Sequence, residues 1–175
     1  LSFVKDDDAN GLGELYVKDL VSGDLYAITT QVAIPGSAAV QAFPYFRDKC
    51  ALSPDGTQIA YTKFTDVDRT DLFVAAADGS GGELQVTGPQ RVKANGFYLI
   101  SRLYMSRLYA PVWAPDGLQL AFAVSRWNSF ARPDTWRITI AGNSKAKKLT
   151  SDWTYSPSSG SNVLIGECLP IAWRN

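Results

Sequence analysis

Histidine is absent from this sequence of 175 residues, and cysteine and methionine are scarce, with two residues and one. Without histidine the sequence can form neither a Ser-His-Asp triad, nor a Cys-His pair, nor a histidine-ligated metal site. It also contains no Gly-x-Ser-x-Gly elbow, no Gly-Lys-Ser/Thr phosphate loop and no Cys-x-x-Cys pair. These absences exclude the commonest hydrolytic, nucleotide-binding and thiol-redox sites from this stretch.

Charge and hydrophobicity exclude two further classes. Lys and Arg number 17, as do Asp and Glu, and no apolar run approaches the ~18 residues that span a bilayer. Zero net charge with dispersed charges offers no electrostatic basis for nucleic-acid binding, and no membrane span is expected. Cys50 and Cys168 precede strands of two different repeat units, so two buried thiols are favoured over a disulfide and the redox compartment stays open.

The stretch from Ser53 to Thr87 is the unit from which the chain is built. It begins with the turn Ser53-Pro54-Asp55-Gly56, where proline presets φ and glycine supplies a positive φ. Strands with polar–apolar alternation and Gly-rich turns follow. In chain order these are a strand over 58–64, a polar loop over 65–70, a strand over 71–76, a turn over 77–82 and a strand over 83–87.

A second copy of the unit begins at the turn Ala114-Pro115-Asp116-Gly117. In this copy Thr135 to Ile140 stands where Asp71 to Ala76 stood, and a strand ending at Thr150 matches the one ending at Thr87. The period of about sixty residues exceeds the usual ~40 because the connections between units are long. Tandem four-stranded antiparallel meanders predict an all-β fold, a β-propeller built of four-stranded antiparallel blades.

The repeats divide the chain into two complete blades and two partial ones. A partial blade spans 1–29, complete blades span 45–87 and 110–150, and a further blade starts over 168–175; insertions occupy 30–44, 88–109 and 151–167. Closed propellers need roughly four to eight blades, so we expect an ordered piece of a longer protein. The alternative is self-association, in which the last strand of one copy completes the first blade of another.

The repeat resembles that of TolB-type propellers, a WD40-like Pro-Asp-Gly repeat. The pattern stands here as Leu52-Ser53-Pro54-Asp55-Gly56 with Ile59-Ala60-Tyr61, and as Trp113-Ala114-Pro115-Asp116-Gly117 with Leu120-Ala121-Phe122. Leu52 replaces the usual Trp, and Arg174 follows Trp173 where Ser is expected. The resemblance implies a non-catalytic scaffold that binds a protein, peptide or other ligand, in the periplasm, elsewhere in the cell envelope or outside the cell.

Two other functions are compatible with a propeller of this kind. The first is the gating propeller of a prolyl-oligopeptidase-type serine peptidase, whose catalytic domain would lie outside this segment. The second is a lyase or sugar-binding propeller that uses the region of Trp127 and Trp136. Asp55 and Asp116 lie in different blades, where each caps its own hairpin, so they do not form a catalytic pair. We therefore expect no catalytic residue and no enzymatic activity in this segment.

One loop has the composition of a metal site. Asp6, Asp8 and Asn10, followed by Gly11, match the first half of a Ca²⁺ loop, because oxygen ligands at alternate positions converge on one cation. The glutamate expected at position twelve is Val17, however, and Asx-Gly hairpin loops look much the same. Calcium and an ordinary solvated turn both stay open, and no other cofactor is expected.

Tyrosine, tryptophan and arginine, which are enriched at protein interfaces, gather in two places. The second insertion contains Ser-Arg-Leu-Tyr twice, in a helical stripe or a long strand, and the other cluster lies around a loop of the second complete blade. Simple packing and capping of the blade are the alternatives. The candidate binding residues are Arg102, Tyr104, Arg107, Tyr109, Arg126, Trp127, Arg132 and Trp136.

Overall fold

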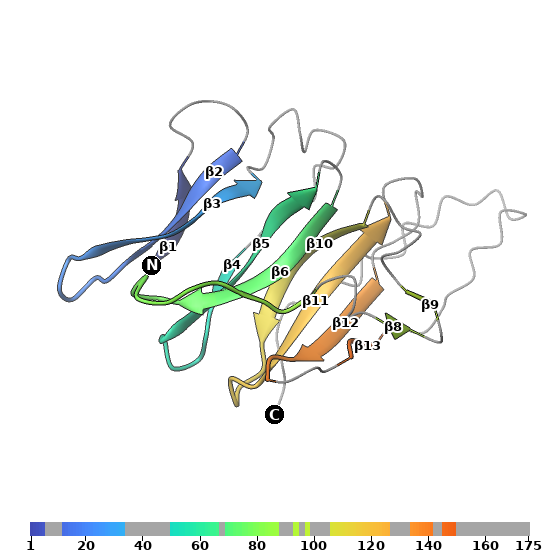
Figure 1. Ribbon diagram of the computed structural model, residues 1–175. Coiled ribbons are helices and arrows are strands. Elements are labelled where there is room, and N and C mark those ends of the chain that lie inside the picture. Colours follow the sequence, from blue (N-terminus) through green and yellow to red (C-terminus); the bar gives the residue numbers. More distant parts are fainter. Residues whose placement is uncertain are drawn as a thin grey trace, which may run out of the picture.

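The computed structural model describes residues 1–5, 12–33, 50–66, 69–87, 93–94, 97–98, 106–126, 134–141 and 145–149. All regular secondary structure in these ranges is β-strand. The strands form three antiparallel sheets that stand side by side, together with one two-stranded hairpin (Figure 1). Each sheet keeps the order of its strands in the sequence, as the predicted meander requires.

Each of the three sheets is one blade. The first blade has three strands, β1 (Ser2–Lys5), β2 (Leu12–Lys18) and β3 (Leu25–Ala33). The second has four, β4 (Cys50–Leu52), β5 (Gln58–Asp66), β6 (Arg69–Ala76) and β7 (Leu84–Gln85). The third has four, β10 (Ser106–Trp113), β11 (Gln119–Arg126), β12 (Asp134–Thr139) and β13 (Lys147–Lys148). The all-β prediction with four-stranded antiparallel blades is confirmed.

Two local predictions are corrected by strand pairing. The predicted polar loop over 65–70 is mostly strand, because β5 continues to Asp66 and β6 begins at Arg69. In the second insertion, β8 (Lys93–Ala94) pairs with β9 (Phe97–Tyr98), a hairpin that the sequence pattern did not indicate. For the end of this insertion the sequence left a helical stripe and a long strand open, and residues 106–113 form the strand β10.

Pairing also defines which residues are equivalent between blades. Tyr61 pairs with Phe73 and Phe73 with Gln85 in the second blade, whereas Phe122 pairs with Trp136 and Trp136 with Lys148 in the third. Counting back two positions from Phe73 and Trp136 makes Asp134, rather than the predicted Thr135, the equivalent of Asp71. In the first blade the same row is Phe3, Tyr16 and Ala27.

The predicted turns are confirmed by their hydrogen bonds. Asp55 Oδ1 accepts a hydrogen bond from Thr57 N at 3.0 Å, and Asp116 Oδ1 accepts one from Leu118 N at 2.9 Å. Gly56 and Gly117, which follow the two aspartates, have φ of 74° and 70°. A side chain at either position would be strained, and each Pro-Asp-Gly turn is therefore locally determined.

The blades pack face to face through two apolar clusters. We call the face of a blade toward its predecessor in the chain the leading face, and the opposite face the trailing face. In the first interface, Leu15 and Val17 of the first blade meet the leading face of the second, which is formed by Ile59, Tyr61, Phe73 and Ala75. In the second interface, Ala60, Leu72, Val74 and Val86 meet the leading face of the third blade, which is formed by Leu120, Phe122, Trp136 and Ile138. Alternation along each strand thus supplies both faces of the middle blade.

Candidate functional site

The two ends of the blades differ in how the chain connects the strands. At one end, the turn end, short turns join the first strand to the second and the third to the fourth in the two four-stranded blades, and β2 to β3 in the three-stranded first blade, at the lower edge of Figure 1. At the opposite end, the connection end, the second strand of a four-stranded blade is joined to the third and the fourth to the next blade. Antiparallel pairing requires this segregation, because successive strands run in opposite directions.

The predicted binding residues are distributed unevenly with respect to this division. Arg107 in β10 pairs with Ser125, and Arg126 in β11 pairs with Ser106, so the two arginines occupy neighbouring backbone positions at the connection end. Tyr109 pairs with Ala123 on the same two strands. The three residues therefore lie near the same end of one strand pair, with Arg107 and Tyr109 at positions of one face of the sheet and Arg126 at a position of the other.

Trp136 lies elsewhere, on the leading face of the third blade. Its side chain is 4% exposed and packs in the second interface, and its Nε1 has no hydrogen-bond partner within the described ranges. The other predicted site residues lie outside the described residues, and their roles stay predictions. These are Asp6, Asp8 and Asn10 of the calcium pattern and Arg102, Tyr104, Trp127 and Arg132 of the binding clusters.

Neither metal-ligand clusters nor membrane spans appear in the described part of the chain. Among residues 1–5, 12–33 and the other described ranges, no three His, Cys, Asp or Glu side chains gather closely enough to hold a metal ion. Nor do these ranges contain a helix with the length and apolar character needed to cross a membrane. Cys50 lies in the first interface, where its Sγ is 3.6 Å from Ser2 Oγ, and Cys168 lies outside the described residues.

A buried carboxylate organises the connection end of the second blade. Asp71 is fully buried at the start of β6, and its Oδ2 accepts hydrogen bonds from Thr65 Oγ1 at 2.7 Å and Gln85 Nε2 at 3.2 Å. Its Oδ1 accepts one from Thr87 Oγ1 at 3.1 Å, and that hydroxyl accepts one from Leu72 N at 2.9 Å. Hydrogen bonds to an ionised acceptor are stronger than neutral ones, so this carboxylate fastens β5, β6 and β7 together.

Thr70 then joins the second blade to the third. Its hydroxyl accepts a hydrogen bond from Leu108 N at 2.7 Å and donates one to Leu108 O at 3.1 Å, so it bridges β6 and β10. Sequence reasoning missed both Thr70 and the Asp71 network. The threonine that ends each unit, Thr87 in this blade, was visible as a repeat, but its partner required knowledge of the strand register.

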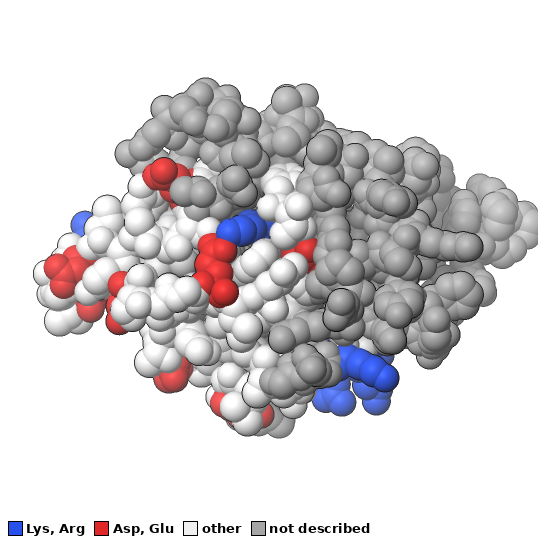
Figure 2. Space-filling view, viewed as in Figure 1, with Lys and Arg blue, Asp and Glu red and all other residues white. Residues whose placement is uncertain are grey.

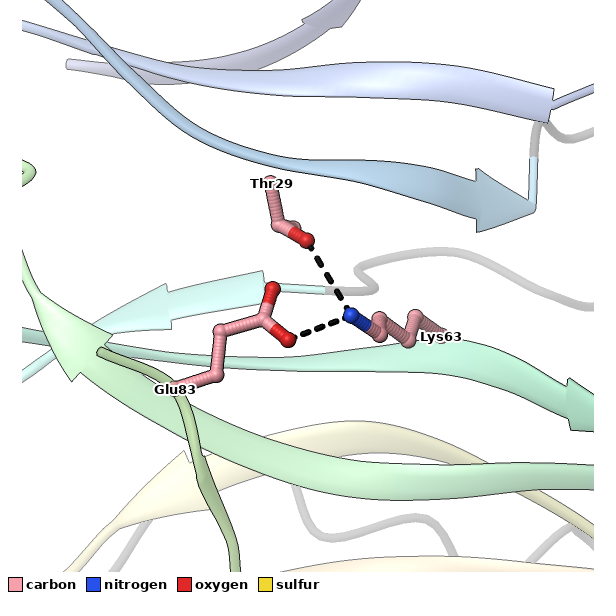
Figure 3. A network of polar contacts seen from close by, with 3 residues as sticks. All are labelled: Thr29, Lys63 and Glu83. Atoms are coloured by element: carbon pink, nitrogen blue, oxygen red, sulfur yellow. Dashed lines mark hydrogen bonds and ion pairs between the residues drawn. The ribbon is translucent and has the colours of Figure 1, made fainter.

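A polar network crosses the first interface (Figure 3). Lys63 on β5 forms an ion pair with Glu83, which precedes β7, and its Nζ lies 3.4 Å from Thr29 Oγ1 on β3 of the first blade. The same Nζ lies 4.9 Å from the centroid of the Phe73 ring. Burial acts to raise the pKa of Glu83, but hydrogen bonds from Lys63 and Thr29 outweigh it, so the pKa lies below its ordinary value.

Tyr61 adds a buried hydroxyl to this region. The Oη atom is inaccessible to solvent and has no hydrogen-bond partner among the described residues. Burial first, and the nearby Glu83 carboxylate second, raise the pKa of this phenol. In the third blade, the positions equivalent to Tyr61, Lys63 and Glu83 carry only apolar residues. These are Phe122, Val124 and Ala146.

The blades stack in series through their faces as in a β-propeller, and the likeness to a solved TolB structure confirms the predicted TolB-like fold. A putative TolB from Agrobacterium tumefaciens has a TM-score of 0.50 and 17% identity, over 85% of this chain and 45% of that one. TolB from Acinetobacter baumannii has a TM-score of 0.49 and 17% identity, over 86% of this chain and 29% of that one. No family model and no curated protein matches. The chain therefore spans less than half the length of either solved structure, and the likeness concerns the fold.

Proposed function

We propose that this chain is a non-catalytic propeller scaffold that binds a protein, a peptide or another ligand at its connection end. The observation that carries the proposal is the segregation of connections by the meander topology. Strand ends that flank the longer connections lie at one end of the blades, and the other end holds short Asx-Gly turns. Binding sites are commonly built on variable loops that a rigid scaffold positions.

Rigidity at the connection end supports this proposal. The Asp71 network ties three strands of the second blade, and Thr70 ties that blade to the third. Arg107 and Arg126 occupy neighbouring positions at the same end, on the third blade. Arginine is enriched at protein interfaces because its planar, multi-donor head group combines charge with apolar stacking.

We further propose that the partner is a protein or peptide and that the chain acts in the cell envelope, in the periplasm or outside the cell. The support for this location and for a non-enzymatic role is the TolB-like fold alone. One fold hosts many functions, so the test is made on the residues at the connection end.

The test compares three arginines that differ in their distance from the connection end. Purified wild type, Arg107→Ala, Arg126→Ala and the matched control Arg137→Ala are immobilised and exposed to a cell-envelope extract of the source organism. Retained proteins are quantified by mass spectrometry. We expect the two connection-end variants to reduce retention of a specific protein about tenfold, as loss of an interface hot spot does, and Arg137→Ala to leave it unchanged.

Two results would overturn the proposal. One is equal loss of retention in Arg137→Ala, which would point to a general charge effect. The other is unchanged retention in both connection-end variants, which would exclude this end as the binding surface.

A further inference from the structure

Strand β10 of the third blade is held to the second blade at two points. Near its start, the Thr70 hydroxyl accepts a hydrogen bond from Leu108 N at 2.7 Å and donates one to Leu108 O at 3.1 Å. Near its end, Trp113 Nε1 donates a hydrogen bond to Ala51 O at 2.8 Å. Leu108 and Trp113 are buried and pack in the second interface. β10 therefore belongs to the third blade by pairing and to the second blade by these contacts.

A β-bulge at Ala110 and Pro111 separates the two points. The two residues stand opposite a single residue of β11, because the register between β10 and β11 shifts there. In a regular strand, residues an odd number of positions apart lie on opposite faces. Leu108 and Trp113 nevertheless pack in the same interface, and the extra residue of the bulge makes this possible.

The backbone of Ala110 has a conformation that its local sequence does not favour. Its φ is 51°, in the left-handed region that residues other than glycine rarely adopt, and the residue is buried. A residue before proline prefers an extended conformation, and Pro111 follows Ala110. Such strain persists only where the surrounding contacts impose it. The contacts at Leu108 and Trp113, on either side of the bulge, impose it here.

The contact at Thr70 also fixes the backbone between two candidate binding residues. Leu108 stands between Arg107 and Tyr109, whose positions lie on the opposite face of the sheet. Rotation or sliding of the strand at this point would break both hydrogen bonds of Thr70 and leave buried polar groups without partners. The placement of Arg107 and Tyr109 therefore depends on a side chain of the second blade.

The groups that attach β10 to the second blade are neutral. They are a hydroxyl, an indole N–H and backbone groups. The ion pairs Lys63–Glu83 and Lys148–Asp134 each lie within one blade, and in Figure 2 the charged side chains form small separate groups of both signs. Because salt screens charges rather than neutral hydrogen bonds, the attachment should not weaken as the salt concentration rises.

We propose that Thr70 is a positioning residue for binding at the connection end, and that it couples the packing of the third blade on the second to the placement of Arg107 and Tyr109. The bulge at Ala110 contributes because it lets β10 reach both attachment points. Coupling of this kind is reciprocal, so a ligand bound at Arg107 should also strengthen the contact between the blades. This inference rests on the proposed function and adds the means by which the scaffold places the binding residues.

Hydrogen exchange of the Leu108 amide, followed by NMR, measures the positioning without a ligand. Thr70→Val replaces the hydroxyl by a methyl group, and we expect the exchange rate to rise about tenfold, as the loss of one hydrogen bond predicts. Thr70→Ser keeps the hydroxyl and should keep exchange slow. The matched control Trp113→Phe removes the other hydrogen bond between β10 and the second blade and should leave the Leu108 amide unchanged. Equal rises in Thr70→Val and Trp113→Phe would indicate general destabilisation and would overturn the proposal.

Binding is then measured with the envelope protein whose retention falls in Arg107→Ala. We expect Thr70→Val to reduce its retention about tenfold, and Thr70→Ser and Trp113→Phe to leave it unchanged. Ala110→Gly should also leave it unchanged, because glycine adopts a positive φ without strain, whereas Ala110→Val should reduce it. Circular dichroism checks that each variant folds, and Thr70→Ala replaces Thr70→Val if the valine variant does not.

The two proposals fail in different ways. Retention that depends on Arg107 but not on Thr70 would overturn the positioning role and leave the proposed function standing. Unchanged retention in Arg107→Ala counts against the proposed function, and exchange of the Leu108 amide then decides by itself whether Thr70 fixes this backbone.

Discussion

The two blade interfaces use the same rows of residues but differ at three positions. Both are built on a buried aromatic row, Tyr61–Phe73 in the first and Phe122–Trp136 in the second. The first adds a phenol hydroxyl, a lysine and a glutamate where the second has only apolar groups: Tyr61, Lys63 and Glu83 against Phe122, Val124 and Ala146. The backbone register is the same in the two cases.

This difference shows that the apolar rows suffice to stack one blade on the next. The Lys63 and Glu83 side chains are 19% and 26% exposed, so the ion pair lies at the rim of the interface and keeps part of its hydration. A pair in such a position contributes little net stability, since desolvation offsets most of the attraction. Interface polarity can therefore vary while blade packing is maintained, and the following experiments test this statement.

The largest effect is expected from the apolar row of the second interface. Phe122 is 1% exposed, and Phe122→Ala leaves a cavity between two blades. We expect the free energy of unfolding to fall by about 3–5 kcal/mol, measured by urea denaturation with tryptophan fluorescence. A loss below about 1 kcal/mol would mean that this row does not hold the blades together.

Asp71 in the second blade and the equivalent Asp134 in the third should differ in their contribution to the free energy of unfolding. Asp71→Ala removes a buried carboxylate that accepts three side-chain hydrogen bonds, and we expect a loss of about 2–3 kcal/mol in unfolding free energy. Asp134 is 37% exposed and 3.1 Å from Lys148 Nζ, so Asp134→Ala should cost less than about 1 kcal/mol. Equal losses in the two variants, measured by the same denaturation, would contradict this comparison.

The third prediction replaces the Lys63–Glu83 ion pair of the first interface by the residues at the equivalent positions of the second, a valine and an alanine. Lys63→Val alone leaves the Glu83 carboxylate without its partner, and we expect a loss of about 1–2 kcal/mol in unfolding free energy. The double variant Lys63→Val with Glu83→Ala should recover most of that loss. A double-mutant cycle measures the coupling, and strictly additive losses would show that the pair does not act as a unit.

The unpaired hydroxyl of Tyr61 should be dispensable. Tyr61→Phe creates the residue found at the equivalent position of the third blade and removes a buried polar atom without a described partner. We expect the free energy of unfolding to stay constant or to rise by up to about 1 kcal/mol. A clear destabilisation would contradict this and would indicate that the hydroxyl interacts with the nearby Glu83 carboxylate or with a partner outside the described residues.

The smallest effect is expected in the dependence of the unfolding free energy on pH below neutrality. The folded-state pKa of Glu83 lies below its ordinary value of 4.5, so the ionised side chain stabilises the folded state above that pH. This stability is lost as the pH falls through the lowered pKa. Chemical denaturation between pH 7 and pH 3 should show a smaller acid-induced decrease for Glu83→Gln than for the wild type. A larger decrease in the variant would contradict the prediction that the ionised Glu83 side chain stabilises the folded state.

Much of the architecture could be predicted because its signals are local. The turns at Asp55 and Asp116 need only an Asx side chain and a glycine with positive φ, and strand alternation follows from burial on one face. The sequence comparison predicted Thr135 as the equivalent of Asp71, one residue away from the correct Asp134. The loops that separate the paired strands differ in length between the two blades, and only the strand register resolves that ambiguity.

The candidate site was less predictable because it depends on contacts between blades. Arg107 and Arg126 seemed to belong to two separate clusters, and only the pairing of β10 with β11 shows that they occupy adjacent backbone positions on opposite faces of one sheet. Trp136 was grouped with the candidate binding residues around the neighbouring loop, but the packing of the third blade on the second buries it. The Thr70 hydroxyl forms hydrogen bonds with the backbone of Leu108, which lies 38 residues away, and no local sequence pattern predicts such a contact.

The sequence by itself determined the strands, the turns and their repetition, since propensity, alternation and turn chemistry act over a few neighbouring residues. Only the tertiary structure decided which residues meet across strands and blades: the Lys63–Glu83 pair, its contact to Thr29 and the buried Asp71. The physical reason is that register and face-to-face packing are properties of paired strands, and a shift of one residue exchanges the two faces.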